Sequence, residues 1–364
     1  MSIATILFLI AGLVLLVVGA EALVKGASRL AVMVGLSPLV IGLTIVAYGT
    51  SSPEMSVSVM SSLSGQADIA VGNVVGSNIF NVLFILGISA IVAPLVVAQQ
   101  LIRLDVPIMI MVSGLMWMFS TDGKISPFEG WILFAGAIGY TLFLIFQSPK
   151  EDNPEVQQEY AQYGGVPDRS FGKLISSLFY IAGGLILLVI GSRWLVDGAI
   201  AIAQVIGVSE VVIGLTIVAA GTSLPELATS VIASIRGERD IAVGNVVGSN
   251  IFNILAVLGL SAGVSPNGIN VAAPVLNFDL PVMLAVAIAC LPIFFTGNKI
   301  SRREGILFTL YYIAYTVYLI LYSTNHDTLP WFNLAMLWFV IPITIVTLIT
   351  ISWRAIQAKP RPRE

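Results

Sequence analysis

One stretch of the sequence occurs twice: Asp68-Ile69-Ala70-Val71-Gly72-Asn73-Val74-Val75-Gly76-Ser77-Asn78-Ile79-Phe80-Asn81 is repeated, residue for residue, at 240–253. At the same offset of 172 residues, 40–81 aligns with 212–253 without a gap, and 31 of the 42 positions are identical. Glycines 12, 19, 26 and 35 also meet glycines 184, 191, 198 and 207 at this offset. The chain therefore consists of two copies of one ancestral unit.

The composition indicates an integral membrane protein. Of 364 residues, 57% are hydrophobic and only 10% charged, and the mean hydropathy is +0.97, outside the range of soluble domains. The net charge of -3 provides no basic surface for nucleic acid. The single cysteine, Cys290, permits no intrachain disulfide, and His326, the single histidine, lies in a polar loop. No Lys or Arg precedes the first apolar run, so we expect a retained helix there and not a signal peptide.

Eleven segments are apolar and long enough to cross a bilayer, which takes about 20 residues. Two of them are short and begin with an aspartate and a proline, Asp105-Val106-Pro107 and Asp279-Leu280-Pro281. The predicted spans are 3–24, 39–63, 69–92, 104–120, 127–147, 173–195, 211–235, 241–263, 279–296, 303–322 and 331–353.

The distribution of Lys and Arg predicts the orientation. With the N-terminus outside and alternating spans, 15 of the 17 basic residues fall on one side of the membrane. The positive-inside rule makes that side cytoplasmic. We therefore expect an external N-terminus and a cytoplasmic C-terminal tail. The polar segment 148–172 is interpreted as a cytoplasmic linker.

Five spans precede the linker, and this odd number forces the second copy to enter the membrane from the opposite side. Inverted repeats are typical of secondary transporters, with the substrate site at mid-membrane between the copies. The predicted fold is an all-α integral membrane protein with two inverted-topology five-helix repeats plus one extra C-terminal helix. The expected division is 1–147 for the first repeat, 148–172 for the linker, 173–322 for the second repeat, and 323–364 for the extra helix and basic tail.

Each copy places a glutamate in the middle of its second span, within Gly49-Thr50-Ser51-Ser52-Pro53-Glu54 and Gly221-Thr222-Ser223-Leu224-Pro225-Glu226. A carboxylate near the bilayer centre is unfavourable by about 2.5–3.5 kcal/mol on insertion scales, so such residues usually face a cavity and have a function. Each proline should break its helix just before the glutamate. Broken helices offer backbone carbonyls as well as hydroxyls.

The next helix of each copy carries a polar stripe at helical spacing. In the first copy Asn73, Ser77 and Asn81 recur every four residues, and Gly72 and Gly76 beside them are spaced for close helix packing. The second copy repeats the pattern. All candidate ligands carry oxygen, which suits hard cations such as Ca²⁺ and Na⁺ and not Zn²⁺ or Cu⁺.

With these paired motifs, the chain resembles the calcium/cation antiporter superfamily, closest to its prokaryotic sodium/calcium exchanger branch. The resemblance implies that the second, third, seventh and eighth helices enclose the ion site, and that the first and sixth helices, with Gly19 and Gly191 on glycine-bearing faces, slide. It implies metal ligation by Glu54, Glu226, Asn81, Asn253, Thr50, Ser51, Thr222, Ser223, Ser77, Ser249 and the carbonyls of Ala47 and Ala219.

One position departs from the family pattern, because some exchangers of this kind have aspartate where this chain has Asn253. The resemblance implies secondary antiport of Ca²⁺ against Na⁺, since the Thr-Ser pairs favour sodium coupling. A Ca²⁺/H⁺ antiporter is the alternative, and a passive cation channel or a membrane receptor or scaffold are the other classes. We expect no enzymatic activity, no cofactor and no obligate protein partner, with the bacterial inner membrane as the location.

Overall fold

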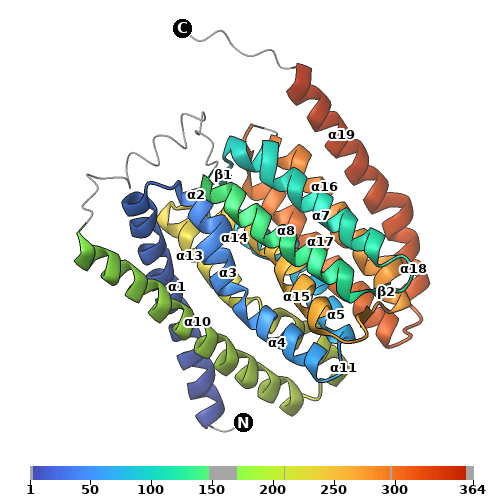
Figure 1. Cartoon of the computed structure of the whole chain (residues 1–364). Helices are drawn as coiled ribbons and strands as arrows, with labels where there is room; N and C mark the ends of the chain where they lie inside the picture. The colour runs from blue at the N-terminus through green and yellow to red at the C-terminus, as the bar shows by residue number, and fades with distance from the viewer. Residues whose placement is uncertain (1–2, 147–169, 209, 296, 358–364) are drawn as a thin grey trace.

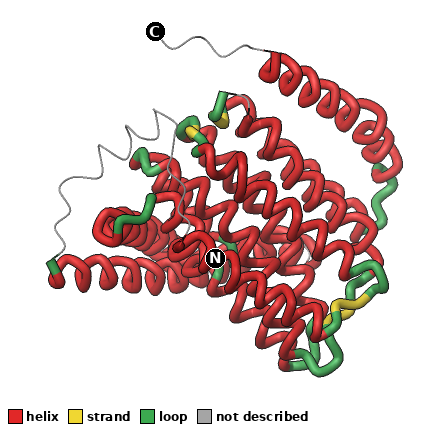
Figure 2. Tube along the Cα trace, turned by 45° about the horizontal axis from the view of Figure 1, so that its top comes forward, coloured by secondary structure: helices red, strands yellow, loops and turns green. Residues whose placement is uncertain are grey.

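The computed structural model describes residues 3–146, 170–208, 210–295 and 297–357, and almost all of them are helical (Figures 1 and 2). Within these ranges nine helices are long and apolar enough to cross a membrane. Two further segments, the second and seventh in chain order, are interrupted helices. The eleven predicted segments are therefore all helical, and the all-α membrane fold is confirmed.

The first half contains five helical segments, which run as follows: α1 (Ile3–Val34); α2 (Pro38–Ile41), π-helix η1 (Gly42–Val46), α3 (Ala47–Thr50) and α4 (Ser52–Leu63); α5 (Asp68–Phe80), η2 (Asn81–Leu86) and α6 (Gly87–Val92); η3 (Leu101–Asp105) and α7 (Val106–Phe119); α8 (Pro127–Phe146). Strand β1 (Leu95–Val96) follows α6, and β2 (Lys124–Ile125) follows α7.

The second half repeats this order and adds one segment: α10 (Phe171–Val205); α11 (Glu210–Ile213), η4 (Gly214–Val218), α12 (Ala219–Gly221) and α13 (Leu224–Arg236); α14 (Arg239–Phe252), η5 (Asn253–Leu258) and α15 (Gly259–Val264); η6 (Val275–Asp279) and α16 (Leu280–Phe295); α17 (Arg302–Ser323); α18 (Leu329–Ala335), η7 (Met336–Val340) and α19 (Ile341–Gln357). Strand β3 (Ile269–Asn270) precedes η6, and β4 (Lys299–Ile300) follows α16.

Two short antiparallel ribbons tie the halves together. Strand β1 pairs with β4 and strand β2 pairs with β3, so each ribbon joins a loop of the first half to a loop of the second. By position in the repeat, β1 corresponds to β3 and β2 corresponds to β4. Exchanging the halves therefore converts one ribbon into the other. This pairing supports the predicted two-fold relation of the copies.

Helices α1 and α10 cross at one side of the molecule, where glycines bring their backbones together (Figure 1). A Cβ atom on Gly12 would lie 2.8 Å from the carbonyl oxygen of Gly191, and one on Gly19 would lie 2.9 Å from that of Gly184. Any side chain at these positions would push the helices apart. The first and sixth helices, which the resemblance implies slide, are therefore in direct contact, and we call this contact the glycine seam.

The ends of α1 and α10 lie about ten residues beyond those predicted, because hydropathy falls at charged residues although the helix continues. In α1 the continuation carries Lys25 and Arg29, whose cationic groups lie 4.9 and 5.5 Å from the ring centroid of Tyr180. The aromatic ring supports both charges. The predicted linker 148–172 falls mostly outside the described residues, and its last two residues, 171 and 172, belong to α10.

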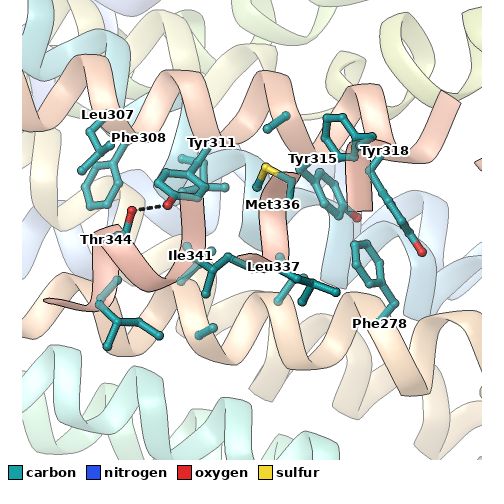
Figure 3. Close-up of a pocket in the computed structure, with 18 of the residues that line it drawn as sticks. Phe278, Leu307, Phe308, Tyr311, Tyr315, Tyr318, Met336, Leu337, Ile341 and Thr344 are labelled. Carbon is teal, nitrogen blue, oxygen red and sulfur yellow. Dashed lines mark hydrogen bonds between the residues drawn. The ribbon is translucent and has the colours of Figure 1, made fainter. Parts of the chain in front are cut away.

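The last helical segment, α18 to α19, runs along the edge of the bundle beside α16 and α17 (Figure 1). It borders a cavity of about 550 Å³ that is lined almost entirely by apolar and aromatic side chains, among them Phe278, Tyr311 and Leu337 (Figure 3). Such a lining offers a cation few oxygen atoms. This cavity is not the site that the motifs predict.

Candidate cation site

Breaks in two helices position the glutamates. Helix α3 ends at Thr50 and α4 begins at Ser52, so Glu54 lies in the first turn of α4, just after Pro53. Proline at the first turn lacks only an amide donor that would be unpaired there anyway. The N-terminus of a helix carries partial positive charge, which favours a carboxylate. The second copy has the same arrangement: α12 ends at Gly221, α13 begins at Leu224, and Glu226 lies in its first turn. The predicted breaks are confirmed.

The two glutamates are bound crosswise by serines of the opposite half. Ser51 donates a hydrogen bond of 2.7 Å to Oε1 of Glu226, and Ser223 donates one of 2.8 Å to Oε1 of Glu54. Glu54 is 0% exposed and Glu226 is 1% exposed. The structure therefore assembles one buried site from residues that are about 170 positions apart in the chain.

Each carboxylate has one oxygen left over. Oε2 of Glu54 and Oε2 of Glu226 are buried and accept no hydrogen bond from the described residues. Buried polar atoms are nearly always paired, and an unpaired one needs an explanation such as a bound ion. Two such oxygens on two carboxylates supply the negative charge that a divalent cation balances.

Two asparagines add further oxygens to the site, Asn81 and Asn253. The amide of Asn81 donates to Oδ1 of Asn250 at 3.0 Å, and the amide of Asn253 donates to Oδ1 of Asn78 at 3.1 Å. These bonds fix which end of each side chain is the oxygen. The Oδ1 atoms of Asn81 and Asn253 remain buried, with no donor among the described residues, so they are available as ligands.

Asn78 and Asn250 also bind each other. Each donates from its amide nitrogen to the backbone carbonyl of the other, at 3.2 and 3.3 Å. These two residues connect α5 with α14 and orient Asn81 and Asn253. Sequence periodicity does not single them out, because they lie off the four-residue stripe. Their identity in the two copies was the available signal.

Asn73 and Asn245 hold the glutamate helices in place. Asn73 donates to Oγ of Ser58 at 3.0 Å and to the backbone carbonyl of Glu54 at 3.3 Å. Asn245 donates to Ser230 and to the carbonyl of Glu226 at 2.9 and 3.3 Å. The predicted polar stripe therefore divides into residues that support the glutamate helix and residues that offer ligands.

The threonines and the remaining serines occupy different places. Thr50 donates to Oδ1 of Asn245 at 3.0 Å, and Thr222 lies 3.5 Å from Oδ1 of Asn73, so both threonine hydroxyls are turned to supporting asparagines. The hydroxyls of Ser223 and Ser77 lie 3.1 Å apart, and Ser77 is the donor because the one hydroxyl proton of Ser223 goes to Glu54. The hydroxyl of Ser249 is buried without a partner among the described residues.

The two predicted backbone ligands lie at corresponding helix starts, Ala47 at the beginning of α3 and Ala219 at the beginning of α12. The carbonyl of Ala47 accepts a hydrogen bond of 3.0 Å from the amide of Ser51, and the hydroxyl oxygen of Thr50 lies 3.3 Å from it. Because the hydroxyl proton of Thr50 goes to Asn245, this carbonyl keeps a lone pair and Ala47 remains a predicted ligand. The carbonyl of Ala219 remains a predicted ligand.

π-Helical turns mark the site helices at matching places. One begins at Asn81 (η2) and its counterpart begins at Asn253 (η5). A π-helical turn adds one residue to the helix and is often found at functional sites. Sequence periodicity did not predict these turns, because the apolar residues that follow read equally well as continuous α-helix.

The chemistry of the assembled site is that of a hard-cation site. Its unpaired oxygens come from two carboxylates, two amides and a hydroxyl. Among the described residues no three His, Cys, Asp or Glu side chains gather at one place. The site therefore has two charged ligands and relies on neutral oxygens for the others, a set suited to Ca²⁺ or Na⁺.

Comparison with known proteins identifies the family of the chain. The sequence profile of the sodium/calcium exchanger protein family matches residues 4–146 and 176–321, which include both copies of the motif. The chain belongs to the sodium/calcium exchanger family. The putative antiporter CaxA of Alkalimonas amylolytica is 40% identical to this exchanger over 324 residues, covering 86% of this chain and 98% of its own. The sodium/calcium exchanger MaX1 of Methanosarcina acetivorans is 35% identical over 349 residues, covering 88% and 99%.

The inner membrane protein YrbG of Escherichia coli is 39% identical over 257 residues, covering 70% of this chain and 77% of its own. Among solved structures, the sodium-calcium exchanger NCX_Mj superposes with a TM-score of 0.73 at 31% identity, covering 86% of this exchanger and 98% of that chain. The predicted family and its class of function, Na⁺/Ca²⁺ antiport, are thereby confirmed. The individual ligands remain predictions.

Proposed function

We propose that this exchanger moves Ca²⁺ in one direction and Na⁺ in the other through the site between Glu54 and Glu226. The observation that carries the proposal is the pair of buried carboxylates, each with one oxygen that no described residue satisfies. Two negative charges balance one Ca²⁺ ion. The same oxygens can release it when Na⁺ occupies the surrounding amide and hydroxyl positions.

The crosswise hydrogen bonds support exchange by alternating access. Ser51 belongs to the first half and holds a glutamate of the second, and Ser223 does the reverse. A shift of one half against the other therefore changes the surroundings of both carboxylates together. The two helices α1 and α10 would move together as one unit, because the glycine seam brings their backbones into direct contact.

The proposed organisation follows the repeat: residues 1–147 and 173–322 as the two transmembrane units, 148–172 as a cytoplasmic linker, and 323–364 as the extra helix and tail. We place the N-terminus outside and the C-terminus in the cytoplasm of a bacterial inner membrane. Reporters fused to the two ends test this. Activity of both reporters on one side of the membrane would rule out the eleven-span orientation.

Sodium coupling is tested by calcium flux in proteoliposomes with sodium and proton gradients imposed separately. An outward Na⁺ gradient should drive Ca²⁺ uptake, and a proton gradient alone should not. Uptake driven by protons alone would instead establish the Ca²⁺/H⁺ alternative. Downhill calcium movement without any counter-ion would indicate a channel, whose ligands would be expected in rings around an oligomer axis.

A further inference from the structure

A second, smaller cavity lies beside the site helix α5. It measures about 200 Å³ and is lined by glycines of α5 and η4 and by polar groups of η6 and α17, namely Gly72, Gly76, Gly214, Asp279, Tyr315 and Thr316. Gly76 immediately precedes Ser77, which is bonded to the hydroxyl that holds Glu54. We call this space the access cavity, because it reaches the helix that borders the cation site.

The equivalent place in the other half is closed. A Cβ atom on Gly248 would lie 2.6 Å from the carbonyl oxygen of Leu43, and one on Gly244 would lie 3.1 Å from that of Leu39. At their counterparts, Gly76 and Gly72, no described atom lies within 4 Å of such a Cβ. Helix α14 is therefore packed against α2 and η1 at these glycines. The predicted close packing is seen in the second copy, whereas Gly72 and Gly76 of the first copy border the access cavity.

Polar residues follow the same asymmetry. Asp279 accepts a hydrogen bond of 2.8 Å from Tyr315 and is partly exposed to the access cavity. Its counterpart Asp105 accepts one of 2.9 Å from Tyr140, is 0% exposed, and has a second oxygen without a donor among the described residues. The same Asp–Tyr pair is thus partly exposed in one half and buried in the other.

One sequence difference between the copies contributes to the closed side. Tyr48 corresponds to Ala220 in the second copy. Its ring stacks on Phe252 with a centroid separation of 4.2 Å, and its hydroxyl is bonded to Thr141, the counterpart of the cavity residue Thr316. An aromatic side chain therefore fills, in the closed half, the region that remains hollow in the other.

We propose that the access cavity is a recruitment site for the transported cation, with Asp279 as its charged ligand, and that Asp105 serves the same purpose when the opposite side opens. The proposal rests on the proposed exchange of Ca²⁺. A carboxylate inside a membrane is energetically unfavourable unless it faces water or a binding partner. Such residues therefore usually line ion pathways. A cleft lined by one sign of charge raises the local concentration of counter-ions. With the N-terminus outside, the access cavity opens to the external face.

The test uses the full-length exchanger in right-side-out and inverted membrane vesicles, with Ca²⁺ as the probe. At the external face alone, Asp279→Asn should raise the half-saturating Ca²⁺ concentration about tenfold. That figure is the lower end of the range by which a charged cleft raises the local concentration of an ion. Asp105→Asn should do so at the cytoplasmic face alone. Asp279→Glu keeps the charge and should retain the parent value. An equal rise at both faces, or none at either, would overturn the recruitment role.

Thiol labelling tests the cavity independently of transport. In a Cys290→Ala background, Thr316→Cys should react with a membrane-impermeant reagent from the external face, whereas Thr141→Cys should be protected. Equal labelling of the two cysteines, or labelling of Thr141→Cys alone, would refute the assignment of the open side. A parent protein that carries no Ca²⁺ but labels as expected would refute the proposed function and leave the cavity in place.

Discussion

Replacing either site glutamate by glutamine should abolish calcium exchange much more completely than sodium exchange. Both carboxylates are buried, so an effective dielectric constant of about 20 is appropriate, and a unit charge about 4 Å from a divalent ion then contributes about 8 kcal/mol. The neutral amide is less costly to desolvate than the carboxylate. If this difference offsets half of the lost attraction, the net loss of binding free energy is about 4 kcal/mol, which lowers Ca²⁺ affinity about a thousandfold. A monovalent ion loses half as much, or about thirtyfold.

The measurement is counterflow of labelled Ca²⁺ and Na⁺ in proteoliposomes containing Glu54→Gln or Glu226→Gln. Glutamine keeps the shape and can still accept the hydrogen bonds from Ser223 and Ser51. Asp122→Asn removes a carboxylate from an exposed loop and should leave both rates unchanged. Calcium counterflow near the parent rate in both glutamine variants would refute the central role of this pair, as would equal losses for the two ions.

Three further outcomes follow from the geometry. Gly184→Ala places a Cβ 2.7 Å from the carbonyl oxygen of Gly19, so it should lower both the thermal unfolding temperature and the exchange rate. The control Gly183→Ala places a Cβ that meets no described atom within 4 Å and should change neither. Asn81→Ala and Asn253→Ala each remove a dipole and not a charge, and should weaken Ca²⁺ binding, measured by calorimetry, by about 10- to 100-fold. Protons compete with metal for carboxylate oxygens, so calcium flux should fall as the pH is lowered from neutral, and a flat profile between about pH 5 and 8 would contradict this.

The parts of the fold that depend on local sequence were predictable. Hydropathy located all eleven helical segments, and the Pro53 and Pro225 motifs located the breaks, because proline acts on its own helix whatever surrounds it. Self-comparison identified both glutamates as equivalent. The ends of the long helices were missed because charged residues such as Lys25 can continue a helix beyond the apolar core.

The parts that depend on contacts between the halves were not predictable. The role of Asn78 arises from its hydrogen bonds with Asn250 of α14 and Asn253 of η5, and no periodicity within α5 encodes it. Likewise, identical glycines pack closely in one half and border a cavity in the other. Two copies of one motif can occupy different surroundings, so the repeat alone could not show which side of the site is accessible. In the sequence, Asp105 and Asp279 are notable only because each begins one of the two short predicted spans.

The crosswise bonds between Ser51 and Glu226 and between Ser223 and Glu54 bear on how such a protein could have arisen. Neither half contains a carboxylate together with the serine that holds it. A single copy would therefore need a second copy facing it to complete the site. A substitution at Ser51 acts on the carboxylate of the other half, Glu226, and not on Glu54 of its own half.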